Sequence, residues 1–73
     1  MKKTFVMQDL DCANCAAKME KAILKIDGVI SATVSFFAQK LVLEAEDEKF
    51  EAALQEACRA VSRVDHDCRI VLK

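Results

Sequence analysis

The feature that most restricts the fold of this 73-residue chain is the order in which two hydrophobic periodicities alternate along it. Alternation of apolar and polar residues predicts strands, whereas apolar residues at three- and four-residue spacing predict helices. The strand pattern occupies residues 3–8, 29–36, 40–45 and 67–72. The helical pattern occupies residues 15–26 and 46–61. The predicted order is therefore strand, helix, strand, strand, helix, strand.

This order predicts a ferredoxin-like α+β sandwich (βαββαβ), in which a four-stranded antiparallel sheet carries both helices on one face. No linker, repeat or low-complexity segment interrupts it, so we assign residues 1–73 to one domain. In this topology the turn after the first strand, the hairpin after the second and the turn after the second helix share one edge. We therefore expect residues 9–14, 36–39 and 63–67 to lie close together.

The same periodicities predict which side chains face the core. The inward positions of the helices are Cys15, Met19, Ala22, Ile23, Ile26, Phe50, Ala53, Leu54, Ala57 and Val61. Those of the strands are Ile30, Ala32, Val34, Phe36, Leu41, Leu43, Cys68, Ile70 and Leu72. We expect Asn14 to cap the first helix and Gly28, the only glycine, to end it.

The composition excludes several classes of protein. A net charge of −1 without a basic stripe argues against a nucleic-acid partner. No apolar run is long enough to enter a membrane, and no apolar segment of a signal peptide follows Met1-Lys2-Lys3. We therefore expect a cytoplasmic location, where thiols stay reduced. In that compartment the four cysteines favour metal binding or redox chemistry over a disulfide framework.

The segment Asp11-Cys12-Ala13-Asn14-Cys15 carries the predicted chemistry. Two cysteines at this spacing can present both sulfurs to one ion, and a helix start at Cys15 favours thiolates. Thiolates select soft or borderline ions, which include Cu(I), Zn(II), Cd(II), Pb(II) and Hg(II). Two thiolates satisfy Cu(I), whereas a divalent ion needs the further ligand and charge that Asp11 supplies. We predict a Zn(II), Cd(II) or Pb(II) site at Asp11, Cys12 and Cys15, with Cu(I) as the alternative.

A second group of side chains is predicted at the same edge. His66, the only histidine, lies between Asp65 and Asp67, and it could supply an extra ligand. We favour a solvated turn with an exposed histidine. Cys58 and Cys68 are interpreted as packing residues, with Cys68 as a weaker candidate for a ligand.

The motif at Asp11–Cys15, the helix residues 16–23 and the segment Ile26-Asp27-Gly28-Val29 together resemble the heavy-metal-associated domain. The resemblance covers essentially the whole chain and implies the same βαββαβ fold. The family motif is Gly-Met-X-Cys-X-X-Cys, with Asp at X in the zinc, cadmium and lead branch. Cys12 and Cys15 match its metal cysteines, and Asp11 matches its third ligand. Asp9-Leu10 replaces Gly-Met, so we expect Leu10 to plug the loop and Asp9 to restrict its backbone.

The resemblance implies the N-terminal cytosolic domain of a heavy-metal-exporting P-type ATPase, at the cytosolic face of the plasma membrane. Such a domain is not itself an enzyme, and its partners are the membrane domain of the ATPase or other metal-handling domains. A free-standing metallochaperone and a Cu(I)-binding domain are the alternatives. A thiol–disulfide oxidoreductase is disfavoured because the chain has no proline to place opposite the cysteines. We expect a monomer that metal can bridge into a dimer, since the site is open.

Overall fold

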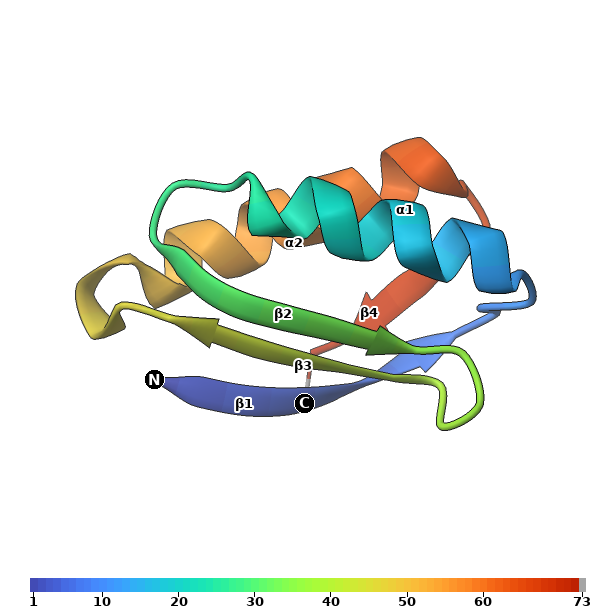
Figure 1. Cartoon of the computed structure of the whole chain (residues 1–73), viewed down its shortest axis with the longest axis horizontal. Helices are drawn as coiled ribbons and strands as arrows, with labels where there is room; N and C mark the ends of the chain where they lie inside the picture. Colours follow the sequence, from blue (N-terminus) through green and yellow to red (C-terminus); the bar gives the residue numbers. More distant parts are fainter. Residues whose placement is uncertain (73) are drawn as a thin grey trace.

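Strands and helices follow the predicted order in the computed structural model, which describes residues 1–72. The elements are β1 (Lys2–Gln8), α1 (Ala13–Leu24), β2 (Val29–Ser35), β3 (Lys40–Ala45), the 3₁₀ turn η1 (Asp47–Lys49), α2 (Phe50–Val64) and β4 (Arg69–Val71). The strands form one sheet in the order β2-β3-β1-β4, and every neighbouring pair is antiparallel. Both helices cover the same face of this sheet (Figure 1). The predicted ferredoxin-like sandwich is confirmed.

The core lies between the sheet and the two helices. Alternate residues of each strand point toward the helices, and the apolar stripes of α1 and α2 meet them. The largest fully buried side chains are Met7, Met19, Ile23, Leu41, Leu43 and Val61. Phe5 of β1 stacks on Phe50 of α2, with ring centroids 6.4 Å apart. Within residues 1–72 the buried side chains are all apolar, so the polar chemistry of the domain lies at its surface.

Two predicted inward positions of the strands are wrong. Ile30 is 60% exposed because the pairing register of β2 and β3 shifts between Val29 and Ser31. Ile30 is the extra residue of this bulge, and a bulge turns its residue out of the alternation. Leu72 is 59% exposed because β4 already ends at Val71.

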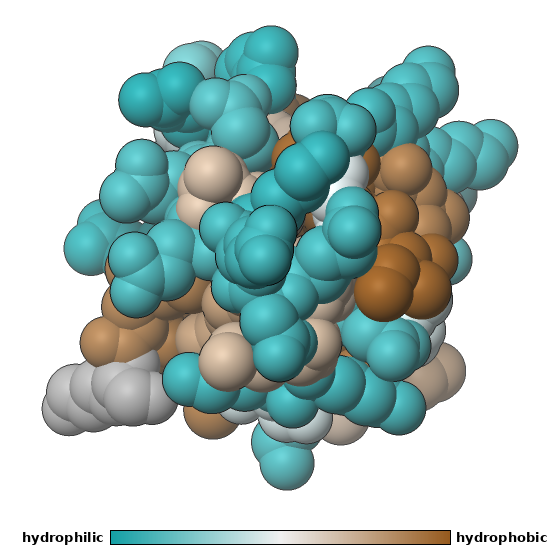
Figure 2. All heavy atoms as spheres, turned by 90° about the vertical axis from the view of Figure 1, so that its left-hand side faces the viewer, coloured by the Kyte–Doolittle hydropathy of each residue, from teal (hydrophilic) through white to brown (hydrophobic). Residues whose placement is uncertain are grey.

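Figure 2 shows that the end of the molecule near the α1–β2 turn is mostly hydrophilic, with an apolar patch on one side.

The helix ends also differ from the sequence-based prediction. Helix α1 begins at Ala13 and its N-cap is Cys12, so the assignment of the cap to Asn14 is wrong. Its C-cap is Lys25, and Gly28 lies farther on, in the turn to β2, with φ of +91°. Helix α2 begins at Phe50, after η1, and continues to Val64. Neither helix of the described range has the length and hydropathy that crossing a bilayer requires.

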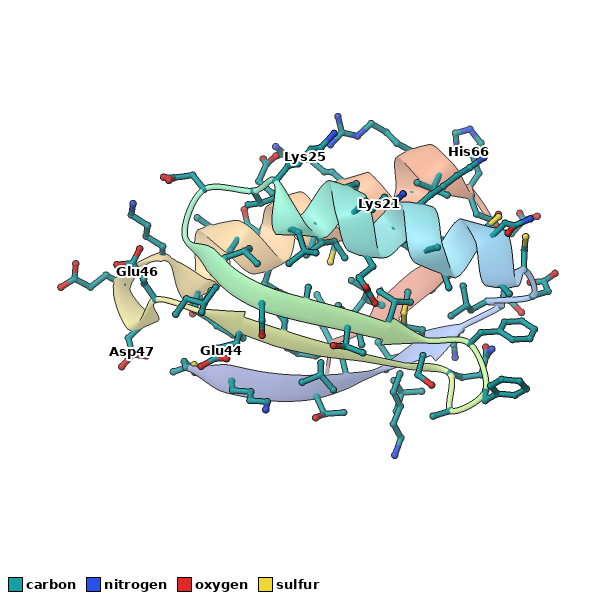
Figure 3. All side chains as sticks on the ribbon, viewed as in Figure 1. Lys21, Lys25, Glu44, Glu46, Asp47 and His66 are labelled. Carbon is teal, nitrogen blue, oxygen red and sulfur yellow. The ribbon has the colours of Figure 1, made fainter. Side chains whose placement is uncertain are left out.

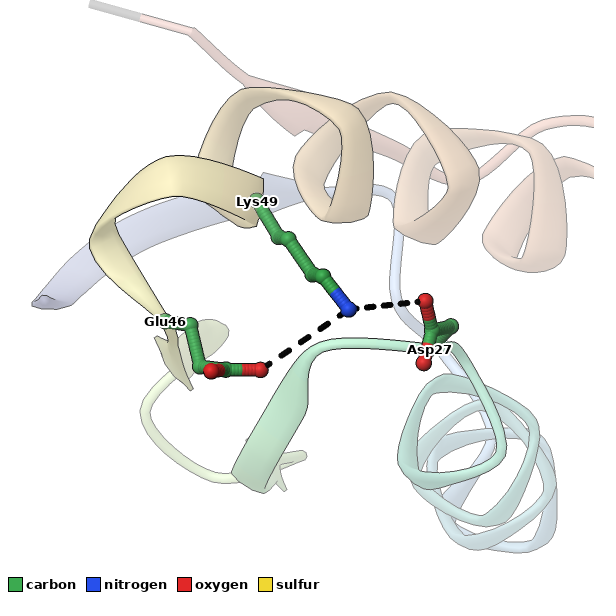
Figure 4. A network of polar contacts seen from close by, with 3 residues as sticks. All are labelled: Asp27, Glu46 and Lys49. Atoms are coloured by element: carbon green, nitrogen blue, oxygen red, sulfur yellow. Dashed lines mark hydrogen bonds and ion pairs between the residues drawn. The ribbon is translucent and has the colours of Figure 1, made fainter.

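A polar network closes the end of the domain where β3 leads into η1 (Figure 4). The Nζ of Lys49 lies 3.1 Å from Oδ2 of Asp27 and 4.0 Å from Oε2 of Glu46. The backbone N–H of Glu46 donates to the carbonyl of Gly28 at 3.0 Å. These contacts join the α1–β2 turn to η1 at the end opposite the start of α1 (Figure 1).

Candidate metal site

Three segments that are distant in the sequence meet where α1 begins. The loop before α1, the β2–β3 hairpin and the α2–β4 turn lie at one end of the sandwich (Figure 1). The side chain of Gln39 in the hairpin is hydrogen-bonded to the backbone of Leu10 in the loop. Asp65 in the α2–β4 turn is close enough to Cys15 to influence its pKa. The predicted meeting of these segments is confirmed.

The loop between β1 and α1 reverses the chain within four residues. It starts at Asp9, whose φ of +60° lies in the left-handed region. Leu10 then turns inward and is only 2% exposed, as expected for an apolar plug. Asp11 returns to the surface, and Cys12 is extended, with φ of −137° and ψ of 121°, at the N-cap. The plug and the cap together place Cys12 and Cys15 at the molecular surface.

The two motif cysteines are connected by hydrogen bonds. The backbone N–H of Cys15 donates to Sγ of Cys12 at 3.3 Å, and the N–H of Ala16 donates to the Cys12 carbonyl at 3.0 Å. The pKa of Cys12 is lowered, first by the Cys15 N–H and then by the Cys15 thiol, which both donate to its sulfur. The pKa of Cys15 is raised because its thiol donates that proton, and because of burial and the charges of Cys12 and Asp65. The helix start therefore favours the thiolate at Cys12 rather than at Cys15.

The predicted third ligand, Asp11, is exposed beside this pair. Among residues 1–72, no three His, Cys, Asp or Glu side chains converge on a point that could hold a metal ion. Carboxylates of this edge nevertheless lie close enough to raise the pKa values of Cys15 and Cys68. Burial raises the pKa of the Cys68 thiol, and the carboxylates of Asp65, Asp11 and Asp9 raise it further. Lys18 also lies near the two motif cysteines and lowers the pKa of each, so the charges around the pair are of both signs.

The remaining candidates for ligands do not join the pair in the described part of the chain. His66 is exposed at the far end of α2, on the side where α1 begins (Figure 3). The backbone N–H of Asp67 donates to Oδ1 of Asp65 at 3.0 Å, which closes a tight turn. Cys68 is 2% exposed and belongs to the core, and Cys58 is half-buried against it. The exposure of His66 and the burial of Cys68 agree with the solvated-turn and packing interpretations, and a part for either residue in metal binding stays a prediction.

Gln39, also at this edge, belongs to no pattern in the sequence that would identify it as part of the site. Gln39 follows the hairpin residues Phe36, Phe37 and Ala38, and its φ of +55° is unusual for a residue other than glycine. Its side chain contacts two segments of backbone, at Leu10 and at Phe36. A glutamine in a turn is common, and only the folded chain reveals these partners.

Known proteins resemble the chain in sequence and in fold. The sequence matches the heavy-metal-associated domain over residues 4–63. A zinc/cadmium/lead-transporting P-type ATPase of Escherichia coli is 41% identical over 51 residues, which are 66% of this chain and 7% of that protein. The copper chaperone CopZ of Enterococcus hirae is 25% identical over 71 residues, which are 97% of this chain and all of that protein.

A solved structure agrees with these matches. The N-terminal domain of a potential copper-translocating P-type ATPase from Bacillus subtilis superimposes with a TM-score of 0.75 at 29% identity, covering 94% of this chain and 84% of that one. The chain spans less than a tenth of the metal-transporting ATPases that it matches, with shares of 9% and 7%. The chain belongs to the heavy-metal-associated domain family, and it is a domain that binds heavy metal.

Proposed function

We propose that this domain binds one Zn(II), Cd(II) or Pb(II) ion through Cys12 and Cys15, with Asp11 as the third ligand. The observation that carries the proposal is the exposed carboxylate of Asp11, which directly precedes the N-cap cysteine. Because Asp11 is exposed, its side chain can turn toward an ion without losing a packed contact. Two thiolates and one carboxylate give a charge and a ligand number that suit a divalent ion.

We propose further that the domain is the cytosolic part of a P-type ATPase that exports such ions. Three of the matched ATPases carry names that include zinc and cadmium as their transported ions. The metal is cargo, and the domain delivers it to the membrane domain or regulates pumping. The cytosolic face of the plasma membrane is the location that this role requires. Hydrolysis of ATP belongs to other parts of such a transporter.

The surface position of the cysteines supports a mechanism of transfer by ligand exchange. Both sulfurs are half-buried at the start of α1, so a thiolate of a partner can approach the ion from outside. A three-ligand site leaves one position open for that thiolate. The ion then passes one bond at a time, without a free intermediate. The same open position lets one ion bridge two copies of an otherwise monomeric domain.

A Cu(I)-binding metallochaperone is the second candidate. It is favoured by the match to the copper chaperone CopZ, which covers that protein completely. Cu(I) is satisfied by two thiolates and needs no carboxylate. Asp11 therefore distinguishes the two candidates, since only the divalent ion uses it.

Competition titration with Zn(II) and with Cu(I) tests the proposal. We expect Cys12→Ser and Cys15→Ser to abolish Zn(II) binding at micromolar protein. We expect Asp11→Ala to weaken Zn(II) by on the order of tenfold or more and to leave Cu(I) affinity unchanged. Asp27→Ala is the matched control, because Asp27 pairs with Lys49 at the opposite end of the domain.

Two outcomes contradict the proposal. Unchanged Zn(II) affinity in Cys12→Ser would place the ligands elsewhere. An equal loss of Zn(II) and Cu(I) affinity in Asp11→Ala would remove the argument for a divalent ion and favour the copper chaperone.

A further inference from the structure

The side chain of Gln39 fastens the β2–β3 hairpin to the loop that carries the metal cysteines. Its Oε1 accepts a hydrogen bond from the N–H of Leu10 at 3.2 Å, and its Nε2 donates to the carbonyl of Leu10. The same Nε2 donates to the carbonyl of Phe36 at 2.7 Å. The backbone carbonyl of Gln39 also accepts from the N–H of Met7 at 2.8 Å. One residue thus binds the backbone on both sides of the reversal at Asp9.

The contact with Leu10 satisfies both polar groups of that residue's backbone. Within a sheet, the backbone of a neighbouring strand would supply these two hydrogen bonds. Leu10 has no such strand partner, because β1 ends at Gln8. Only one orientation of the Gln39 amide fits, because Leu10 N–H needs an acceptor and two carbonyls need a donor. The amide therefore replaces the missing strand at the point where the loop leaves the sheet.

The backbone of Gln39 has an unfavourable conformation in this position. Its φ of +55° costs a residue other than glycine about 1 kcal/mol or more, and asparagine tolerates it better. Asparagine is one methylene shorter, so its amide would not reach Leu10 from the same backbone. The length of the glutamine side chain is therefore what the contact requires.

The position of Leu10 connects this contact to the metal site. Leu10 lies one residue before Asp11 and two before Cys12. The Cys12 end of the loop is fixed by the start of α1, where Ala16 N–H donates to the Cys12 carbonyl. With Leu10 also fixed, the short segment that holds Asp11 has both of its ends anchored.

We propose that Gln39 is a positioning residue of the metal site, which tightens metal binding and slows metal release by fixing the loop in advance. The inference rests on the proposed function insofar as the ion binds Cys12 and Cys15. A loop that is already ordered loses less conformational entropy when it closes on an ion. Ligands held by a rigid surrounding also keep their geometry better than ligands on a free loop.

Two substitutions separate the contact from the backbone conformation. Gln39→Asn keeps an amide and eases the backbone but shortens the side chain. Gln39→Met keeps the length but removes the polar atoms. We expect both to raise the apparent Zn(II) dissociation constant about tenfold and to speed release to a chelator. We also expect faster hydrogen exchange of the Leu10 amide in the metal-free protein, because its acceptor is lost.

Two control variants exclude a merely structural role. Gln8→Asn makes the same substitution at an exposed residue of β1 next to the same loop. Leu43→Val lowers the stability of the core in the middle of β3 without touching the loop. In conditions where every variant is fully folded, a loss of global stability does not weaken binding. We therefore expect both controls to bind Zn(II) as the wild type does.

Wild-type affinity and release rate in Gln39→Asn and Gln39→Met would overturn the inference. An equal loss of affinity in Leu43→Val would overturn it too, because Gln39 would then act only through stability. If the wild-type domain bound neither Zn(II), Cd(II) nor Cu(I), the proposed function itself would fail. Exchange of the Leu10 amide needs no metal, so it would still show whether Gln39 fixes the loop.

Discussion

The backbone N–H of Cys15 donates a hydrogen bond of 3.3 Å to the sulfur of Cys12. The sulfur thereby caps α1, a task that serine, threonine, asparagine or aspartate performs in most helices. The cap and the proposed metal ligand are thus the same atom. The donors at the helix start favour negative charge on that sulfur before any ion arrives. The thiol of Cys15 keeps its proton to a higher pH than the thiol of Cys12 does. A metal ion that binds Cys15 must displace this proton.

This difference between the cysteines predicts unequal reactivity in the metal-free protein. The pKa of Cys12 is lowered and that of Cys15 is raised, so Cys12 forms the thiolate at lower pH. Since only the thiolate reacts with iodoacetamide, we expect Cys12 to be modified faster than Cys15 at neutral pH. Its rate should also reach a plateau at lower pH than the rate of Cys15. Mass spectrometry of peptides from pH-stepped reactions measures both rates.

A variant separates the two donors to Cys12. Cys15→Ala removes the thiol donor but keeps the backbone N–H, which is the larger cause of the lowered pKa. We expect the pH profile of Cys12 to move toward higher pH and to remain below that of an ordinary cysteine. Identical profiles for Cys12 and Cys15 in the wild type would contradict the assignment of the thiolate to Cys12.

The left-handed backbone of Asp9 predicts the effect of substitutions there. The φ of +60° is free of strain for glycine, costly for alanine and intermediate for aspartate. We expect Asp9→Gly to raise the free energy of unfolding by about 0.5 kcal/mol and Asp9→Ala to lower it by a similar amount. Urea unfolding of the metal-free domain measures both changes. A stabilising effect of Asp9→Ala would contradict this prediction. It would mean that removal of the carboxylate outweighs the strain of the left-handed backbone.

The turn at Gly28 is predicted to reject any side chain. Its φ is +91°, and a Cβ built there would lie 2.8 Å from the Cβ of Lys49. Left-handed strain and this overlap should together lower the free energy of unfolding in Gly28→Ala by about 2–4 kcal/mol. Loss of the exposed Asp27–Lys49 ion pair in Lys49→Ala should change stability little (Figure 4).

A double-mutant cycle separates the two causes at Gly28. Lys49→Gly removes the Cβ that the new side chain would meet, whereas Lys49→Ala keeps it. A Cβ at position 28 would meet both the Cβ of Lys49 at 2.8 Å and its Cδ at 2.9 Å. We therefore expect Lys49→Gly, which removes both atoms, to recover more of the loss in Gly28→Ala than Lys49→Ala, which removes only the outer one. Equal recovery by both would mean that the outer atoms of Lys49, and not its Cβ, make the close contact.

The elements and the cysteine pair could be predicted because each depends on neighbours in the sequence. The helical spacing of Met19 and Ile23 and the alternation of Leu41 and Leu43 are local patterns. Topology alone then brought the loop at Cys12 to the edge that it shares with the hairpin and the α2–β4 turn.

The remaining features depend on contacts that these patterns do not contain. The bulge at Ile30 comes from the pairing of β2 with β3, which periodicity within one strand does not reveal. Asn14 is not the cap because α1 already begins at Ala13, and the N–H of Cys15 donates to the sulfur of Cys12 instead. Gln39 and Leu10 are 29 residues apart, so no short motif joins them. Asp11 is exposed and joins no cluster of ligands among residues 1–72, so its role as the third ligand stays a prediction.

Cys68 lies near the proposed metal site, and its burial predicts that it is not a ligand. Its side chain is 2% exposed, and burial raises the pKa of its thiol, so it stays protonated at neutral pH. We expect Cys68→Ala to lower the free energy of unfolding by about 1 kcal/mol, through the small cavity it leaves, and to keep Zn(II) affinity within about twofold. Cys58→Ala is the matched control on α2, and urea unfolding with chelator competition measures both properties. A loss of Zn(II) affinity in Cys68→Ala as large as that in Cys15→Ser would instead identify Cys68 as a third thiolate, which the ion draws out of the core.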